Sequence, residues 1–235
     1  VTLELGGKAP LVIFDDADFE LAVQTAMDAN FYTAGEVCSN ATRVFIQEGI
    51  AEKVIAEMVT RASEMRIGDP MSDDVQMGAI ISAHHQKRVL DYIQIGVDEG
   101  AVIATGGKAA HPQGFENGFF IEPTIMTNCR DDMRIVKEEI FGPVMSVLTF
   151  KTEEEAIERA NQTDFGLGAG LITSDLSRAH RVADALEAGN IWINSYNLIP
   201  PDWPFGGIKQ SGFGRESSHY AIEAYSEVKA VYIQL

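Results

Sequence analysis

Short β-rich runs alternate with helical patterns along most of this sequence, and that alternation limits the folds open to it. In residues 18–32, apolar side chains recur at Phe19, Val23, Met27 and Phe31, the i, i+4 spacing of an amphipathic helix. Similar patterns predict helices over 18–32, 50–65, 83–99, 152–161 and 175–188, and strands over 42–47, 101–105, 144–150, 167–173 and 190–194. This β-α-β-α order predicts an α/β fold, in which helices cover both faces of a parallel sheet.

Length and charge limit the class of protein further. A chain of 235 residues can bury one substantial core, and 46% hydrophobic with 23% charged residues is typical of a globular protein. The net charge of −17 argues against a nucleic-acid partner, because phosphate binding needs a basic surface. No apolar run reaches the roughly 20 residues that cross a bilayer, so no membrane association is expected.

The two cysteines, Cys38 and Cys129, are too few for a disulfide scaffold. Because Cys38 lies in a segment that suggests reactivity, a reducing, cytoplasmic location is expected. Cys129 has no comparable surroundings and is expected to be structural. No signal peptide is visible, and the chain begins at Val1 without an initiator methionine.

Two segments contain residue types suited to covalent catalysis. Residues 3–8 (LELGGK) include Glu4, a candidate general base, and residues 35–40 (GEVCSN) include Cys38, a candidate nucleophile. A cysteine attacks as its thiolate, so its site must favour the anion and admit a substrate. Cys38 follows the helix predicted over 18–32, in a short stretch where a loop can expose the thiol. Taken alone, a single cysteine is more often a buried apolar residue, and a glutamate at a strand end more often faces water.

Two further segments, residues 138–144 (EEIFGPV) and 204–216 (PFGGIKQSGFGRE), complete an ordered set of four. With these four segments the chain closely resembles the aldehyde dehydrogenase superfamily over its whole length. The resemblance implies a three-layer, Rossmann-like catalytic domain over 1–227 and an oligomerisation strand over 228–235. It also implies that the amino-terminal half, with most of the dinucleotide site, is absent here, so the isolated chain is expected to be inert.

The resemblance implies that an aldehyde is oxidised to a carboxylic acid. Cys38 would attack the aldehyde carbon to give a thiohemiacetal, and hydride transfer to NAD or NADP would leave a thioester. Glu4 would then activate the water that hydrolyses the thioester. Because Leu3 and Leu5 flank Glu4, desolvation is expected to raise its pKa, which suits a base working near neutral pH.

The resemblance also implies contacts to the cofactor. Glu139 and Phe141 match the positions that hold the ribose and the nicotinamide, respectively. Gly6 and the backbone of Leu5 are expected to pass close to the nicotinamide, where a missing side chain leaves room. Without the resemblance, Glu139 would be interpreted as a surface acid and Phe141 as a core residue. The choice between NAD and NADP is set in the half that is absent here.

Betaine aldehyde dehydrogenases, within this superfamily, suggest two further roles. At positions matching Lys209 and Gly212, backbone oxygens bind a monovalent cation such as K⁺, and a glutamate matching Glu216 takes part in a proton relay. Ile208 stands where many relatives have tyrosine, so the local packing departs from the common pattern. Gly-rich loops and Arg-Glu pairs also have ordinary structural uses.

Three aromatic residues bear on the substrate. Tyr196, Trp203 and Phe205 lie where the family lines its substrate tunnel, and aromatic rings hold a quaternary ammonium by cation–π attraction of roughly 0.5–2 kcal/mol per ring. Betaine aldehyde or an ω-aminoaldehyde is therefore the favoured substrate class. The alternative is that these rings form an apolar lining for any medium-chain aldehyde.

The last eight residues, 228–235 (VKAVYIQL), alternate as an edge strand does. In the family the matching strand joins an oligomerisation sheet, so a homodimer or homotetramer is expected for the full-length enzyme. The alternative is a strand that folds back on its own domain.

Two other functions compete with aldehyde oxidation. A thiol hydrolase or acyl-transferase could use Cys38 and Glu4 without hydride transfer, although it would leave Glu139 and Phe141 without a role and the sequence indicates no positioned histidine. The third possibility is an inactive homologue that acts only in assembly, against which the presence of Cys38 and Glu4 argues.

Overall fold

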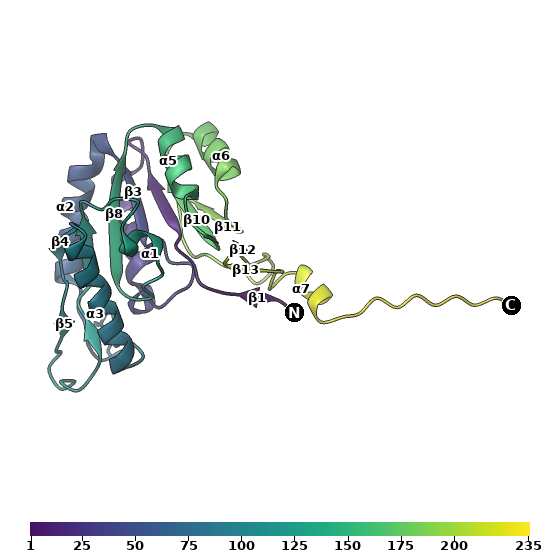
Figure 1. Ribbon diagram of the computed structural model, residues 1–235, viewed down its shortest axis with the longest axis horizontal. Coiled ribbons are helices and arrows are strands. Elements are labelled where there is room, and N and C mark those ends of the chain that lie inside the picture. The colour runs from purple at the N-terminus through teal and green to yellow at the C-terminus, as the bar shows by residue number, and fades with distance from the viewer.

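A seven-stranded sheet forms the centre of the computed structural model, which describes residues 1–235 (Figure 1). Its strands lie in the order β11-β10-β2-β3-β8-β7-β4, and all neighbours except β7 and β4 are parallel. In chain order these are β2 (Pro10–Ile13), β3 (Arg43–Gln47), β4 (Val102–Thr105), β7 (Thr124–Thr127), β8 (Val144–Phe150), β10 (Gly168–Ile172) and β11 (Asn190–Ile193). The predicted α/β fold with a mainly parallel sheet is confirmed.

Helices cover both faces of this sheet because its strands alternate apolar side chains between two cores. On β2, Leu11 and Ile13 belong to one buried cluster, while Val12 belongs to the other. The first cluster packs beneath α1 (Phe19–Phe31) and α2 (Glu48–Glu64); the second packs beneath α3 (Ala83–Asp98), α4 (Arg134–Lys137), α5 (Glu153–Asn161) and α6 (Leu176–Ala185). The result is the three-layer arrangement expected from the sequence.

The helix ends follow ordinary capping chemistry. Asp18, Ser82, Thr152 and Asp175 each accept a hydrogen bond from a backbone N–H in the first turn of the helix that follows. Gly100 has a φ of 103° just beyond α3, as predicted for a glycine that ends a helix. The predicted helix over 175–188 is three residues too long, because α6 ends at Ala185.

The edge strand β4 differs from the simplest prediction of an all-parallel sheet, because it runs antiparallel to β7. A parallel neighbour needs a crossover, usually through a helix. Between β4 and β7 the chain forms only the short strands β5 (Ala109–Ala110) and β6 (Phe120–Ile121), which pair with each other, so it returns in the opposite direction. The central strand β2 and strand β7 were not predicted; both are short.

The remaining short elements bring the two ends of the domain together. They are β1 (Leu3–Glu4), η1 (Tyr32–Gly35), β9 (Phe165–Gly166), β12 (Ile208–Lys209), β13 (Gly212–Phe213) and α7 (Tyr220–Ala224). Strand β1 pairs with β13, which places Glu4 opposite Gly212, more than two hundred residues further along the chain. The glycine-rich segment is thereby held against the amino-terminal segment.

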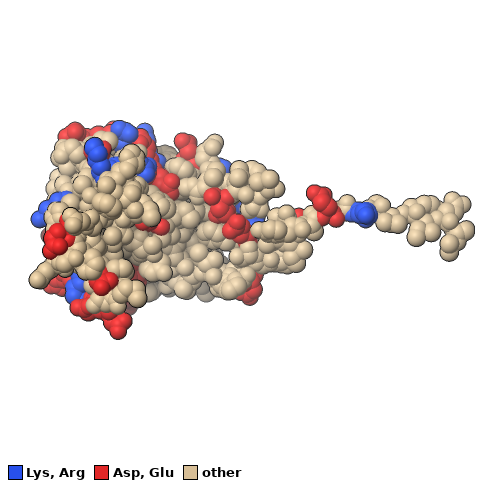
Figure 2. Space-filling view, turned by 90° about the horizontal axis from the view of Figure 1, so that it is seen from below, with Lys and Arg blue, Asp and Glu red and all other residues tan.

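Residues 228–235 are extended but form no strand within this chain, and each of them is exposed. They project away from the domain beyond α7 (Figure 1). Figure 2 shows the same projection, with acidic side chains spread over the rounded part of the molecule. No helix of the chain combines the length and the apolar character that a membrane span requires.

Candidate active site

Glu4 is held by the glycine-rich segment. Its Oε1 accepts a hydrogen bond from the N–H of Gly207 at 3.2 Å, while Oε2 is buried without a partner. Burial raises the pKa of Glu4, and the nearby carboxylate of Glu216 raises it further, whereas the Gly207 N–H and Arg215 lower it. The predicted direction of the pKa shift is correct. The assumed cause, desolvation by Leu3 and Leu5, is only partly correct, because both of these side chains are partly exposed.

Cys38 lies in a loop whose backbone is bent sharply before it. Thr33 and Ala34 in η1 have φ values of 51° and 52°, and Gly35 follows at 74°. A Cβ at Gly35 would come within 2.3 Å of the backbone of Gly142, so only glycine permits this close approach. Residues 35–40, called the nucleophile loop after the candidate role of Cys38, therefore pack directly against the loop that carries Phe141.

Hydrogen bonds also hold the two residues that follow Cys38. The hydroxyl of Tyr196 donates to the carbonyl of Ser39 at 2.9 Å, and the Ser39 hydroxyl donates to Oδ1 of Asn197 at 2.6 Å. Nδ2 of Asn197 in turn donates to Oδ1 of Asn40 at 3.2 Å. The two residues after Cys38 are thus fixed to the segment that follows β11.

Glu139 lies against the first glycines of the chain. Its Oε1 accepts from the N–H of Gly7 at 3.1 Å, and a Cβ at Gly6 would come within 2.2 Å of its Oε2. The absent side chain at Gly6 therefore makes room for a carboxylate. Phe141, two residues on, has a φ of 59°, which is unusual for an aromatic residue.

These groups line one surface cavity of about 490 Å³. Its lining residues are Glu4, Leu5, Gly6, Cys38, Ile81, His85, Arg88, Glu139 and Phe141. Six of the nine are residues that the sequence singled out, from three segments far apart in the chain. The volume lies in the range of small-molecule sites.

The cavity does not by itself favour the thiolate of Cys38. Burial raises the pKa of the thiol, and the carboxylates of Glu4 and Glu139 raise it further. The backbone N–H groups of Cys38 and Ser39 act in the opposite direction but less strongly than burial. A nearby positive charge or a base would lower the pKa of this thiol. Cys129, also a free thiol, has its pKa raised to about 11, which fits the structural role expected for it.

Three residues of the cavity carried no sequence signal. Ile81, His85 and Arg88 come from the start of α3 and the residue before its cap, and no recognised motif includes them. Nη2 of Arg88 donates to the carbonyl of Glu139 at 2.8 Å, and Nε2 of His85 lies 2.6 Å from the carbonyl of Phe141. The one available signal was the helix predicted over 83–99, because the N-terminus of a helix often faces a ligand-binding site.

Other predicted residues lie outside this cavity. Glu216 is bridged to Phe205 by two backbone hydrogen bonds of 2.7 and 2.9 Å, and it reaches the site only through its charge on Glu4. Tyr196 is partly buried under the nucleophile loop, with its ring 4.8 Å from that of Trp192. Trp203 is 58% exposed and lines a separate hollow of about 190 Å³. Neither Tyr196 nor Phe205 lines that hollow.

Lys209 and Gly212 flank a tight turn between β12 and β13. Both have positive φ values, 54° and 131°. Nζ of Lys209 donates to the carbonyls of Asn161 and Thr163 and pairs with Glu187 at 2.6 Å, so its side chain ties this turn to the end of α5. These contacts give both residues a structural use.

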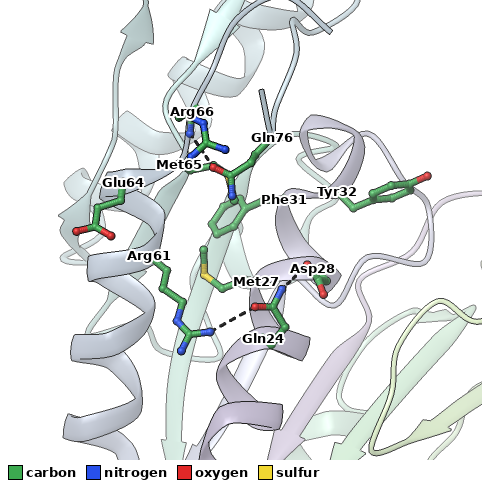
Figure 3. Close-up of a pocket in the computed structure, with 10 residues that line it drawn as sticks. All are labelled: Gln24, Met27, Asp28, Phe31, Tyr32, Arg61, Glu64, Met65, Arg66 and Gln76. Carbon is green, nitrogen blue, oxygen red and sulfur yellow. Dashed lines mark hydrogen bonds between the residues drawn. The ribbon is translucent and has the colours of Figure 1, made fainter. Parts of the chain in front are cut away.

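Another hollow, of about 450 Å³, lies between α1 and α2 (Figure 3). Its Arg61 is engaged by Glu20 and Glu57, and Gln24 bonds to Asp28. No cysteine lines it. Carboxylates and arginines line it, but no residue of the four predicted segments does.

Fold and site together define a class: an α/β domain in which a cysteine, two glutamates and a glycine line one cavity. The profile of the Aldehyde dehydrogenase family matches residues 1–231. The chain is 54% identical over 233 residues to betaine aldehyde dehydrogenase of Mesorhizobium japonicum, covering 99% of this chain and 48% of that protein. It is 52% identical to the Brucella anthropi enzyme of the same name, covering 100% and 48%.

Solved structures agree with these matches. The NAD⁺ complex of an aldehyde dehydrogenase from Bacillus cereus superposes with a TM-score of 0.96 at 47% identity, covering 100% of this chain and 47% of that one. Betaine aldehyde dehydrogenase of Staphylococcus aureus in complex with NAD⁺ gives 0.94 at 43% identity, covering 95% and 44%. The chain belongs to the aldehyde dehydrogenase family, and it spans about half the length of the curated relatives it matches.

Proposed function

We propose that the full-length protein oxidises an aldehyde to a carboxylic acid with NAD(P)⁺ through a cysteine thioester. One observation carries the proposal: Glu4, Cys38, Glu139 and Phe141 line a single cavity although they lie on separate segments. Family membership and the similarity to enzymes solved with NAD⁺ support it. Reduction of the nicotinamide by the full-length protein in the presence of an aldehyde tests it directly.

In this proposal Cys38 forms the carbon–sulfur bond. Its sulfur attacks the aldehyde carbon, and the former carbonyl oxygen of the resulting thiohemiacetal needs hydrogen-bond donors such as backbone N–H groups. NAD(P)⁺, when bound, supplies a positive charge and accepts the hydride whose departure converts the thiohemiacetal into a thioester. The hydrogen bonds that join Ser39 to Tyr196 and Asn197 restrain the nucleophile loop while the substrate reacts.

Glu4 then serves as the base for thioester hydrolysis. A carboxylate with a raised pKa binds a proton more readily, so it can take one from water as the water attacks the thioester carbon. Its Oε2 is free of protein partners, and Oε1 is held by Gly207, so one oxygen remains available. We also propose that Glu216, whose charge already reaches Glu4, takes part in the onward proton relay.

The residues present fit the nicotinamide end of the cofactor. Glu139 offers carboxylate oxygens for ribose hydroxyls, Phe141 offers a ring, and Gly6 leaves space beside them. The rest of the cofactor is proposed to bind the remainder of the full-length protein.

For the substrate we propose betaine aldehyde or an ω-aminoaldehyde. The support is the similarity to enzymes named betaine aldehyde dehydrogenase, at 52 to 54% identity. Phe205 and the exposed Trp203 remain the proposed aromatic contacts, with Tyr196 behind the nucleophile loop. Comparing kcat/KM for betaine aldehyde and an uncharged aldehyde of equal length tests this choice; equal values would favour the medium-chain alternative.

A thiol hydrolase remains the second candidate, because His85 lines the same cavity as Cys38. The prediction that no histidine is positioned near the site was therefore wrong. However, Nε2 of His85 is engaged by the carbonyl of Phe141, and no hydrogen bond joins it to Cys38. Thioester or ester hydrolysis without any aldehyde-dependent reduction of nicotinamide would favour this candidate.

Three further proposals concern a cation site, the cellular location and the division of the chain. The backbone oxygens of Lys209 and Gly212 are proposed to bind a monovalent cation such as K⁺, in addition to holding the turn described above. The free thiols of Cys38 and Cys129 suit a reducing compartment, so the cytoplasm is the proposed location. Residues 1–227 are proposed to be the catalytic unit, and residues 228–235 a strand for assembly.

Changes at Glu139 or Phe141 should impair cofactor use more than thiol reactivity. We expect Glu139→Gln and Phe141→Ala to raise KM for the cofactor or slow hydride transfer by about tenfold, since each loses one contact of about 1–2 kcal/mol. Iodoacetamide should still label Cys38 in both variants. Stopped-flow absorbance and labelling rates provide the measurement. Unchanged cofactor affinity and hydride transfer in both variants would remove these residues from the cofactor site.

Removal of residues 228–235 should lower the oligomeric mass of the full-length protein. The segment exposes Val231, Tyr232 and Ile233 by about three-quarters or more and lies away from its own domain, so pairing with a partner subunit would cover it (Figure 1). Light scattering measures the mass, and circular dichroism checks that each subunit stays folded. An unchanged oligomer would mean that the tail serves only its own chain.

A further inference from the structure

Glu36 joins two of the segments that build the cavity, the nucleophile loop and the start of α3. It is two residues before Cys38, and its side chain is only 16% exposed. Its Oε1 accepts a hydrogen bond from the N–H of Ile81 at 3.2 Å and lies 3.5 Å from Nε2 of His85. Through this one carboxylate the nucleophile loop is tied to the start of α3.

His85 continues the link from α3 to the loop of Phe141. Its side chain is 12% exposed, and its Nε2 lies 2.6 Å from the carbonyl of Phe141, close enough for a strong hydrogen bond. Because a carbonyl can only accept, Nε2 carries the proton. The imidazole therefore fixes the peptide group that follows Phe141.

That peptide group needs support from outside. Phe141 has a φ of 59°, a conformation that is strained for a non-glycine residue and persists only where surrounding contacts enforce it. Two close contacts confine the next residue: a Cβ at Gly142 would come within 2.7 Å of Val89, and Gly35 packs on the Gly142 backbone. His85 is the polar contact that acts on Phe141 itself.

We propose that Glu36 and His85 form a positioning pair that couples the nucleophile loop to the backbone of Phe141 and so sets where the cofactor ring can pack. This inference rests on the proposed use of NAD(P)⁺. Glu36 holds the start of α3 through the N–H of Ile81 and places its carboxylate beside the imidazole. The imidazole gives its Nε2 proton to the Phe141 carbonyl and so holds Phe141 in its left-handed conformation. Glu36 does not line the cavity, so it can affect the cofactor only through other residues.

The test is a double-mutant cycle in the full-length protein, with His85→Ala, Glu36→Ala and both together. Losing one buried hydrogen bond should raise KM for the nicotinamide cofactor about three- to tenfold in each single variant, with kcat changed by less than about threefold. KM for the cofactor in the double variant should be no higher than in the single variant with the higher KM, because both substitutions release the same peptide group. His85→Gln should restore most of the affinity, since its amide can donate to the same carbonyl.

His84→Ala is the matched control, because His84 is the exposed neighbour on the same helix. It should leave KM unchanged. Iodoacetamide labelling of Cys38 should stay within about twofold in His85→Ala. If Glu36→Ala leaves KM normal while His85→Ala raises it, His85 acts on the cofactor alone and the pair is refuted; normal KM in both also refutes it.

A structural measurement separates this inference from the proposed function. Should the wild-type protein reduce no nicotinamide, the proposed function fails, but a crystal structure of His85→Ala still reports on the pair. We expect Phe141 to leave its φ near 59° in that variant. An unchanged Phe141 backbone would overturn the positioning role whatever the reaction is.

Discussion

Cys38→Ala in the full-length protein is expected to abolish aldehyde oxidation and any esterase activity together. Both reactions would pass through an acyl group on the same sulfur, and alanine offers no nucleophile. A loss of at least about a thousandfold in kcat is expected. Activity assays with an aldehyde and with an activated ester provide the measurement.

Cys129→Ala is the control for that experiment. Its thiol is a poor nucleophile, with a pKa raised to about 11, and its sulfur donates to the carbonyl of Met126 at 3.3 Å. Normal turnover is expected in this variant, with at most a modest loss of thermal stability. Near-normal turnover in Cys38→Ala would end the assignment of the nucleophile.

Glu4→Gln should separate the two halves of the reaction. Glutamine keeps the shape and the acceptor oxygen for Gly207, but it cannot take a proton from water. The first turnover should therefore still release a burst of reduced cofactor, while steady turnover falls by about a hundredfold or more. Stopped-flow absorbance distinguishes the burst from the steady rate. Loss of the burst would place Glu4 in an earlier step, and an unchanged steady rate would remove it from the mechanism.

The pH dependence follows from the same carboxylate. Because the pKa of Glu4 is raised, its basic form accumulates only as pH rises through that value, so hydrolysis should accelerate with pH and then level off. This rise of the hydrolysis rate with pH should be absent in Glu4→Gln.

The same substitution should also make Cys38 more reactive. It removes a negative charge that raises the pKa of the thiol, so more thiolate should form at a given pH. Iodoacetamide should then label Cys38 faster than in the wild type. A slower reaction would show that Glu4 acts as a base toward the thiol.

The sequence was sufficient for the class of fold and for proposing the principal residues of the site. The helical period over 18–32 and the β-branched runs report local structure directly. They predicted five of the seven α-helices and five of the seven strands of the central sheet to within a few residues. Cys38 and Glu4 were found because their motifs are contiguous. The strands β2 and β7 were missed because short apolar runs carry no period that separates them from other buried segments.

What only the tertiary structure decided is how separate segments act on each other. The antiparallel edge strand β4 follows from a connection without a helix, and the cavity needs α3, the nucleophile loop and the Phe141 loop at once. His85 and Glu36 look like ordinary helix and loop residues in the sequence, because their roles come from partners 45 to 56 positions away. Tyr196 holds Ser39, the residue after Cys38, across 157 positions. Local sequence determines conformation through neighbours a few residues away, whereas positioning and desolvation depend on contacts that exist only after the sheet has formed.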